Sequence, residues 1–361
     1  MFNKKSAQTF LIILTAAPLL CANFALAQEE SLLPETISET IVETPLTDLS
    51  VDTSDLPAST PQDDGIPPFS DVKPGSEYYF GLKKLKSLGL IQGYEDGTFK
   101  PKQAINRAEA LKLLVRAIPY QSMSNQERPL ATLNATAEIT GQPSCPFPDL
   151  DTKAWYFQYV CEAFNNQVVA GYPDGTFHPE QTINEVEALK IIILQSGLTT
   201  ETGSAENFDD VPPDTWFTEY AKLANQKTFV VEDRDGNLNA ADQLNRGDFA
   251  MTIYRTLQST KAGSEFGRAT FYGGRFDGQG TASGETFDTS VMTAAHKTLP
   301  FGTIVRVTNL TNGKTVDVRI NDRGPYVNGT IIDLSTSAFK AVDSVSTGVF
   351  QSEIQILQPA T

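Results

Sequence analysis

One pattern occurs three times between residues 67 and 259, and this repetition limits what the middle of the chain can fold into. Each copy opens with Phe-x-Asp, continues through a helix-like segment and a turn, and ends in a second helix-like segment. We place the copies at 67–120, 145–198 and 206–259, with an insertion loop at 121–144 between the first two. A unit of about 50 residues cannot bury its apolar faces alone, so the three copies should pack together.

Apolar residues within the repeats recur at helical spacing, which predicts two helices in each repeat. The clearest stripes are Trp155, Tyr159 and Ala163 in a first helix, and Leu111, Leu114, Val115 and Ile118 in a second. An asparagine stands one residue before each second helix, where its side chain can cap the helix by accepting a backbone N–H. These residues are Asn106, Asn184 and Asn245.

The start of the chain is typical of an exported protein. A basic n-region, the apolar run FLIILTAAPLL and the small residues around Ala27 predict a secretory signal peptide at 1–27. The run is shorter than the roughly 20 residues of a membrane span, and no later segment is apolar for long enough. We therefore expect a soluble protein of the cell wall or periplasm. Lipidation of Cys21 is less favoured, because Leu19 and Leu20 precede it instead of a small residue.

Residues 28–66 hold ten acidic residues and no Lys or Arg, so most of the net charge of −16 lies there. Such a segment cannot bury enough apolar surface to fold, which predicts an acidic, disordered linker. Nucleic acid is an unfavourable partner for this chain. Without Cys21, Cys145 and Cys161 form an even pair in an oxidising compartment, which predicts a disulfide that pins a loop to a helix. Two unpaired buried thiols are the alternative.

The repeats resemble S-layer homology (SLH) modules, above all in GYPDGTFHPEQTINEVEALK. The resemblance implies an all-α, pseudo-threefold helical bundle that binds a cell-wall polysaccharide through a motif arginine and an anionic sugar. By position this arginine is Arg107 in the first repeat and Arg246 in the third, although a surface ion pair is an equal alternative for each. The second repeat has Glu185 there, which cannot donate to an anion. The third departs in its turn, Val231 to Gly236.

From Gly267 on, short β-rich runs alternate with Gly, Asn and Asp. The runs GTIVRVTNL and KTVDVRIND surround Asn312-Gly313, the strongest short hairpin signal. TSAFKAV, after a Ser/Thr cap, predicts a brief helix. A small closed barrel of about six strands suits such a segment, because closure removes exposed strand edges.

Residues 266–358 resemble the rare lipoprotein A (RlpA-like) family in Ala-Ser-Gly-Glu, Thr-Ala-Ala-His, Asn-Asp-Arg-Gly-Pro-Tyr and Ile-Ile-Asp-Leu-Ser. The resemblance implies an all-β double-psi β-barrel and a septal-ring type of lytic transglycosylase, which cleaves peptidoglycan glycan strands to 1,6-anhydro-muramic acid products without a cofactor. It assigns catalytic roles to Asp322, His296 and Glu285. We assign substrate binding to Tyr272, Arg323 and Tyr326.

Glycan cleavage by this route needs one acid that later acts as a base, because the C6 hydroxyl of the sugar is the attacking group. An aspartate with a pKa of about 3.9 is a poor acid at neutral pH, so its surroundings must raise that value. Asp333 or Glu285 could do so for Asp322 by charge repulsion. Asp333 opens a helix start, however, so we expect it to bond to nearby backbone as a scaffold residue.

No spacing of His or Cys matches a metal site, so we predict no metal. The segment 233–242 alternates Asp and Asn but has Gly236 in its fourth place and Leu244 in its twelfth, unlike an EF-hand. The leading hypothesis is a wall-anchored lytic enzyme. A non-catalytic, expansin-like wall-loosening protein is the alternative, and an endo-glucanase-like hydrolase would need a second carboxylate about 6.5 to 9.5 Å from Asp322.

Overall fold

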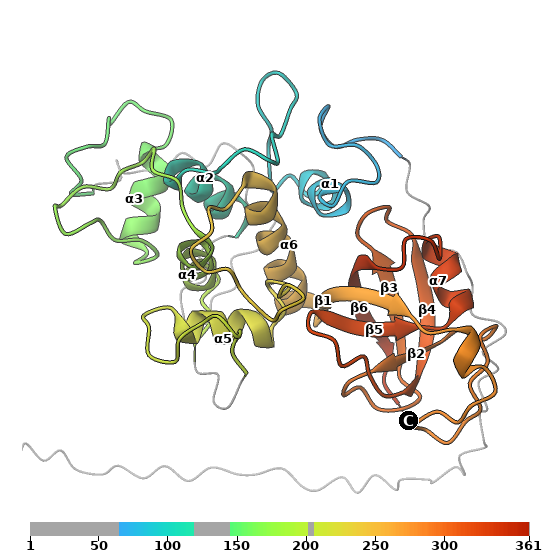
Figure 1. Ribbon diagram of the computed structural model, residues 1–361. Coiled ribbons are helices and arrows are strands. Elements are labelled where there is room, and N and C mark those ends of the chain that lie inside the picture. Colours follow the sequence, from blue (N-terminus) through green and yellow to red (C-terminus); the bar gives the residue numbers. More distant parts are fainter. Residues whose placement is uncertain (1–64, 119–144, 201–205, 361) are drawn as a thin grey trace, which may run out of the picture. The chain divides into compact units, whose positions relative to one another are not determined.

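The computed structural model describes residues 65–118, 145–200 and 206–360 (Figure 1). The predicted signal peptide, nearly all of the predicted linker and the predicted insertion loop lie outside these ranges. Within the described ranges, no helix combines the length and the apolar character needed to cross a membrane.

Each repeat contributes two helices. They are α1 (Tyr79–Ser87), α2 (Arg107–Ala117), α3 (Phe157–Asn165), α4 (Glu185–Gln195), α5 (Thr218–Gln226) and α6 (Arg246–Ala262). The predicted caps of the second helices are confirmed, because the side chains of Asn106, Asn184 and Asn245 accept the backbone N–H three residues further on, at 2.8, 3.0 and 2.8 Å.

One of the two predicted stripes is correct and the other is partly wrong. All four apolar residues predicted for the second helix of repeat one are buried. In repeat two, Trp155 lies before α3 begins and is 49% exposed. Its ring instead lies under Lys112, whose Nζ is 4.9 Å from the ring centroid. The buried face of α3 consists of Val160, Cys161 and Ala163, so the stripe is displaced from the predicted one.

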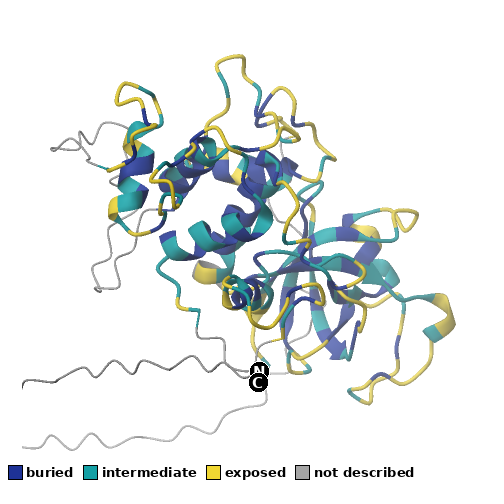
Figure 2. Ribbon diagram, turned by 60° about the vertical axis from the view of Figure 1, so that its left-hand side comes forward, coloured by how far each residue is buried: buried dark blue, intermediate teal, exposed yellow. Residues whose placement is uncertain are grey.

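A closed cycle of backbone hydrogen bonds joins the three repeats just before their second helices. Ile105 N–H donates to the Leu244 carbonyl (3.0 Å), Leu244 N–H to Ile183 (3.1 Å), and Ile183 N–H to Ile105 (3.2 Å). These three side chains are buried. Figure 2 shows buried residues along the helices of the repeats. Because each repeat bonds to both others, losing one would leave buried backbone groups without partners.

The predicted disulfide between Cys145 and Cys161 is confirmed, with the two Cα atoms 5.2 Å apart. It joins the opening segment of the second repeat to α3.

Six strands form a closed barrel, as predicted, and their order in the barrel is β1-β5-β2-β4-β3-β6. Their bounds are β1 Glu265–Phe271, β2 Thr293–His296, β3 Ile304–Asn309, β4 Thr315–Asp322, β5 Thr330–Leu334 and β6 Phe350–Gln358. The predicted hairpin is the antiparallel pair β3 and β4, and the predicted helix is α7 (Thr336–Val342), capped by Ser335. Inward side chains such as Val305, Ile320 and Leu334 form the core, with Phe339 of α7 packed into it.

The barrel follows the last helix almost directly. Helix α6 ends at Ala262, Gly263 adopts a left-handed conformation (φ 64°), and β1 begins at Glu265. Both carboxylate oxygens of Glu353 on β6 accept hydrogen bonds from this junction, one from the Tyr254 hydroxyl (2.6 Å) and one from the Ser264 hydroxyl (2.8 Å). The barrel therefore packs against α6.

Removing the disulfide should destabilise the helical unit. The bridge joins cysteines 16 residues apart, and restricting a loop of that size in the unfolded chain is worth about 3 kcal/mol. We expect reductant to lower the free energy of unfolding by about that amount in urea titrations followed by far-ultraviolet circular dichroism. The double variant Cys145→Ala, Cys161→Ala should have the same free energy of unfolding as the reduced protein, and reductant should not change it. Unchanged stability after complete reduction would contradict the assignment.

Candidate functional site

A groove of about 410 Å³ opens on the barrel beside the ends of β4 and β5. Its lining consists of Phe271, Tyr272, Gly273, Arg275, Phe276, Gln279, Gly280, Phe287, Ala295, Asp322, Arg323 and Asp333. Two carboxylates thus face one groove, one at the end of β4 and the other near the end of β5.

Strand β2 places these carboxylates on its two sides. Ala295 pairs with Asp322 across the parallel β2/β4 ladder and with Asp333 across the antiparallel β2/β5 ladder. Neighbouring strands lie about 4.8 Å apart, so the two aspartate backbones are separated by roughly 10 Å. The residue between them has only a methyl side chain, which leaves the space between the carboxylates open.

Backbone N–H groups hold Asp322 in one orientation. Its Oδ1 accepts from the N–H of Ala282 and from its neighbour Arg323, both at 2.8 Å. Among the described residues no hydrogen-bond donor reaches its Oδ2, so this oxygen is available to a ligand in the groove.

Asp333 has different surroundings, and the prediction that it bonds to nearby backbone is wrong. The hydroxyl of Thr270, on the neighbouring strand β1, donates to its Oδ1, and Ser335 is the residue that caps α7. Burial raises the pKa of Asp333, and the charge of Asp322 raises it further. Asp333 therefore keeps its proton to a higher pH than an ordinary aspartate does.

Aromatic rings form one wall of the groove. Tyr272 stacks on Phe287, with ring centroids 4.3 Å apart, and its buried hydroxyl has no hydrogen-bond partner among the described residues. Burial raises the pKa of Tyr272, and the charges of Asp322 and Asp333 add to the shift. The hydroxyl is thus a neutral donor close to both carboxylates.

Of the two other predicted substrate-binding residues, one lies in the groove and one does not. Arg323 lines the groove, with its guanidinium 3.7 Å from the centroid of the Phe301 ring and its Nη1 donating to the carbonyl of His296 (3.4 Å). Tyr326 is 79% exposed and is not part of the lining. The structure therefore brings Arg323, but not Tyr326, to the carboxylates.

The ring of His296 is not brought to Asp322. It is buried, with Nε2 3.3 Å from a carboxylate oxygen of Glu265 and Nδ1 accepting the N–H of Leu299 (3.0 Å). The bond from Arg323 to its carbonyl is its link to the groove. A role for His296 would therefore be one of positioning.

Glu285 is also bonded to other side chains and is not part of the groove lining. Both its oxygens accept from Arg319 (2.6 and 3.0 Å), and Asn321 Nδ2 donates to one of them (2.9 Å). The Arg319 bonds lower the pKa of Glu285, so it stays ionised and paired. Sequence reasoning did not identify Arg319, although its alternation with Asn321 along β4 places both on one face.

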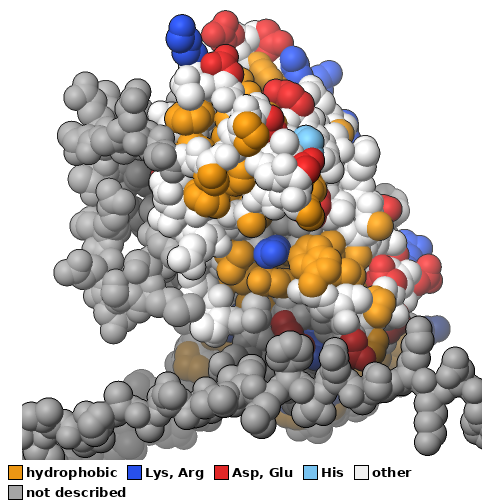
Figure 3. Space-filling model, turned by 90° about the vertical axis from the view of Figure 1, so that its left-hand side faces the viewer, with side chains coloured by type: hydrophobic (Ala, Val, Ile, Leu, Met, Phe, Trp, Pro, Cys, Tyr) orange, Lys and Arg blue, Asp and Glu red, His pale blue; other side chains and the backbone are white. Residues whose placement is uncertain are grey.

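A second cavity, of about 230 Å³, is lined by residues of all three repeats, mostly of the first two, and contains Arg107. Its Nε donates to the Phe177 carbonyl (3.0 Å), and its guanidinium lies 4.9 Å from the Tyr172 ring centroid. The Tyr172 hydroxyl is buried without a partner among the described residues. Lys190 and the 57% exposed Trp216 complete the cavity. Figure 3 shows the face that carries α3, where hydrophobic side chains gather around a basic one.

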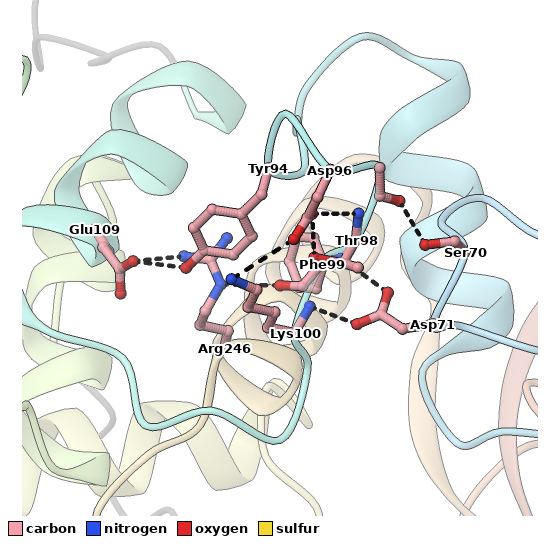
Figure 4. A network of polar contacts seen from close by, with 10 residues as sticks. Ser70, Asp71, Tyr94, Asp96, Thr98, Phe99, Lys100, Glu109 and Arg246 are labelled. Atoms are coloured by element: carbon pink, nitrogen blue, oxygen red, sulfur yellow. Dashed lines mark hydrogen bonds and ion pairs between the residues drawn. The ribbon is translucent and has the colours of Figure 1, made fainter.

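The equivalent arginine of the third repeat is already paired. Arg246 is buried, forms an ion pair with Glu109 (3.5 Å) and lies over the Tyr94 ring. The Tyr94 hydroxyl donates to the same carboxylate oxygen (2.7 Å), which completes the network in Figure 4. In the second repeat, burial raises the pKa of Glu185 to about 7, with Asp248 adding repulsion. Of the three motif positions, that of Arg107 presents a cation to a cavity.

No cluster of three or more potential metal ligands occurs in the described part of the chain. In the segment 233–242, Asp233 instead accepts the backbone N–H groups of Asp235 (2.8 Å) and Asn237 (2.9 Å). This carboxylate therefore organises its own turn.

Comparison with known families agrees with this architecture. The model described as lytic transglycolase matches residues 264–354, and the model of the S-layer homology domain matches residues 68–111 and 146–189. The barrel is thus similar to lytic transglycolase domains, and the first two repeats are similar to SLH domains. The third repeat lies outside the residues that the SLH model matches.

Three relatives illustrate the similarity of the transglycolase domain. The endolytic peptidoglycan transglycosylase RlpA of Pseudomonas aeruginosa is 47% identical over 106 residues, 29% of this chain and 31% of that protein. The probable RlpA of Synechocystis sp. is 47% identical over 116 residues, 32% and 34% of the two chains. The RlpA of Vibrio cholerae is 35% identical over 173 residues, 47% and 62% of the two chains. The chain thus spans about a third of the first two relatives.

Replacing Asp333 should change how stability depends on pH. Because its pKa is raised from 3.8, the folded chain holds this proton more tightly than the unfolded chain, so its contribution to stability is full below about pH 4 and is lost as pH rises through the raised value. We expect Asp333→Asn to be more stable than the wild type at neutral pH and equal to it in acid, measured as Tm against pH.

Asp288→Asn is the control of opposite sign, because hydrogen bonds from Ser290 lower the pKa of Asp288. It should give no gain at neutral pH. A Tm difference for Asp333→Asn that does not vary with pH would contradict the raised pKa.

Proposed function

We propose that this chain is a cell-wall-anchored lytic transglycosylase that cleaves peptidoglycan glycan strands. The observation that carries the proposal is the pair of carboxylates, Asp322 and Asp333, on either side of Ala295 in one groove. Support comes from relatives of the barrel that are named peptidoglycan transglycosylases. The SLH domains suggest the wall as the place of action.

The surroundings of the two aspartates favour different roles. Asp333, whose pKa is raised by burial, would protonate the oxygen of the glycosidic bond as the bond to C1 breaks. Asp322, with its free Oδ2, would stabilise the positive charge that develops on the sugar. We therefore assign the proton to Asp333 in place of Asp322, and keep Asp322 as a catalytic residue.

The same pair can complete the reaction without a water-activating base. The C6 hydroxyl of the cleaved sugar attacks C1, and its proton passes to the Asp333 carboxylate, which restores the starting state. The product would end in 1,6-anhydro-muramic acid. Tyr272 and Arg323 would bind the glycan, whereas His296 and Glu285 would position the strand ends that carry Arg323 and Asp322.

The repeats would hold the enzyme on its substrate. We infer that they form a pseudo-threefold SLH unit in which the cavity at Arg107 takes an anionic sugar of a wall polymer. Arg107 and Lys190 offer positive charge there, and exposed Trp216 offers a flat apolar surface to a sugar ring. Linking this site to the barrel raises the effective concentration of the groove at the wall.

A hydrolase is the second candidate, because two carboxylates in one groove also suit an inverting mechanism in which one activates water. The products separate the two reactions. Transglycosylation leaves anhydro ends, and hydrolysis leaves reducing ends.

The activity is tested with the full chain on peptidoglycan strands stripped of stem peptides. We expect soluble products with anhydro ends by mass spectrometry. The rate should fall about 100-fold or more for Asp333→Asn, since losing proton transfer costs at least this factor. It should fall by a similar factor for Asp322→Asn, because losing an electrostatic contact to the transition state costs about as much. Tyr326→Phe, outside the groove lining, should retain activity. Binding to wall material without any product would favour the expansin-like alternative.

Wall binding should depend on Arg107 more than on other arginines of the repeats. Losing a charge-assisted hydrogen bond of about 1.5 to 3 kcal/mol weakens binding roughly 10- to 150-fold. We expect this loss for Arg107→Ala in co-sedimentation with purified wall material. Arg116→Ala, at the other end of α2, is the matched control and should bind normally. Equal binding by both variants would exclude the Arg107 cavity as the polymer site.

A further inference from the structure

The turn of the third repeat, residues 231–239, departs from the other two at the positions that contact a motif arginine in those repeats. Glu232 stands where the other repeats have Gly93 and Gly171, as the matching hydrogen bonds of the three turns show. Asp233 stands in place of the tyrosines, Tyr94 and Tyr172, over which the motif arginines lie. This turn therefore lacks the ring that an arginine would need.

The same turn contacts the barrel at the loop between the two catalytic aspartates. Oε1 of Glu232 accepts the backbone N–H of Gly329 at 2.5 Å. Arg268 on β1 ties both sides together, because it donates to the carbonyl of Glu232 (3.1 Å) and to the carbonyl of Asn328. Gly329 lies one residue before β5, the strand that carries Asp333.

Two glycines allow the backbones to approach this closely. A Cβ on Gly329 would lie 2.6 Å from the Glu232 carbonyl oxygen. A Cβ on Gly236 would lie 2.6 Å from the side chain of Asp209 in its own repeat and 2.7 Å from the side chain of Asn328 in the barrel. The equivalent Gly175 of the second repeat has nothing within 4 Å of the same position. In the third repeat, the surface that is open elsewhere is thus covered by the barrel.

We propose that the turn of the third repeat is a docking surface for the 323–329 loop of the barrel, and that Glu232 is a positioning residue for the groove. The loop joins Asp322 directly to β5. Holding Gly329 in place therefore restricts the movement of Asp333 relative to Asp322. Docking itself stands on the contacts above, whereas its effect on turnover rests on the proposed function.

The test compares three variants of the full chain. Glu232→Ala removes the acceptor of the Gly329 N–H, and Glu232→Gln keeps an acceptor oxygen at the same place. Asp235→Ala is the matched control, because it removes an exposed carboxylate of the same turn. Hydrogen exchange of peptides from 323–330 is the first readout, and kcat and KM on stripped glycan strands are the second.

We expect Glu232→Ala to speed exchange of 323–330 about tenfold or more and to lower kcat with little change in KM, while Glu232→Gln and Asp235→Ala resemble the wild type. Arg268→Ala, made on the barrel side, should speed exchange of the same peptides. Unchanged exchange in both alanine variants overturns the docking surface. Faster exchange with unchanged kcat overturns the positioning role. If the wild type releases no product, the proposed function fails and exchange alone decides the docking.

Discussion

The pairing of β2 with neighbours of opposite direction is the constraint on which the groove depends. This four-residue strand runs parallel to β4 and antiparallel to β5, and Ala295 is the shared partner of Asp322 and Asp333. Because side chains alternate between the two faces of a strand, a slip by one residue on either side would turn a carboxylate towards the core. Closure of the barrel holds both registers at once, so the carboxylates meet without any direct bond between them.

Within the fixed strands, different hydrogen-bond donors surround each of the two aspartates. Two backbone N–H groups and open space surround Asp322, whereas Asp333 is half-buried beside a hydroxyl and a second carboxylate. Glu285 is bonded to Arg319 on β4, the strand that ends at Asp322. The two acids of one groove thus differ in their surroundings, and environments that differ in this way can give two carboxyl groups different catalytic roles.

Features with local signals were predictable from the sequence. The Asn caps, the Asn-Gly hairpin, α7 and the disulfide each depend on short spacings or on simple counts, and each is present. The presence of Asp333 in the groove beside Asp322 was not predictable in this way, because it depends on which strands become neighbours. Even so, the burial alternation of β5 places Asp333 on the face opposite Ile332 and Leu334, and the same alternation is visible in TIIDL.

The two motif arginines show a second limit of prediction from the sequence. Arg107 and Arg246 occupy the same place in their repeats, and a glutamate follows two residues after the first of them, at Glu109, as Glu187 does in the second repeat. Glu187 turns back to its own cap at Asn184, whereas Glu109 reaches across to Arg246. The same motif position therefore has an arginine beside a cavity in one repeat and a buried, ion-paired arginine in another, because each arginine lies against the following repeat and not its own.

The closed cycle of bonds among Ile105, Ile183 and Leu244 has a consequence for how such a protein can diverge. In an open solenoid, a repeat can be gained or lost at either end because each touches only its neighbours. Here the first repeat bonds to the last, so there is no end at which to add or delete one. The copy number is set by geometry, and new properties must arise by substitution inside an existing repeat while its backbone bonds are kept.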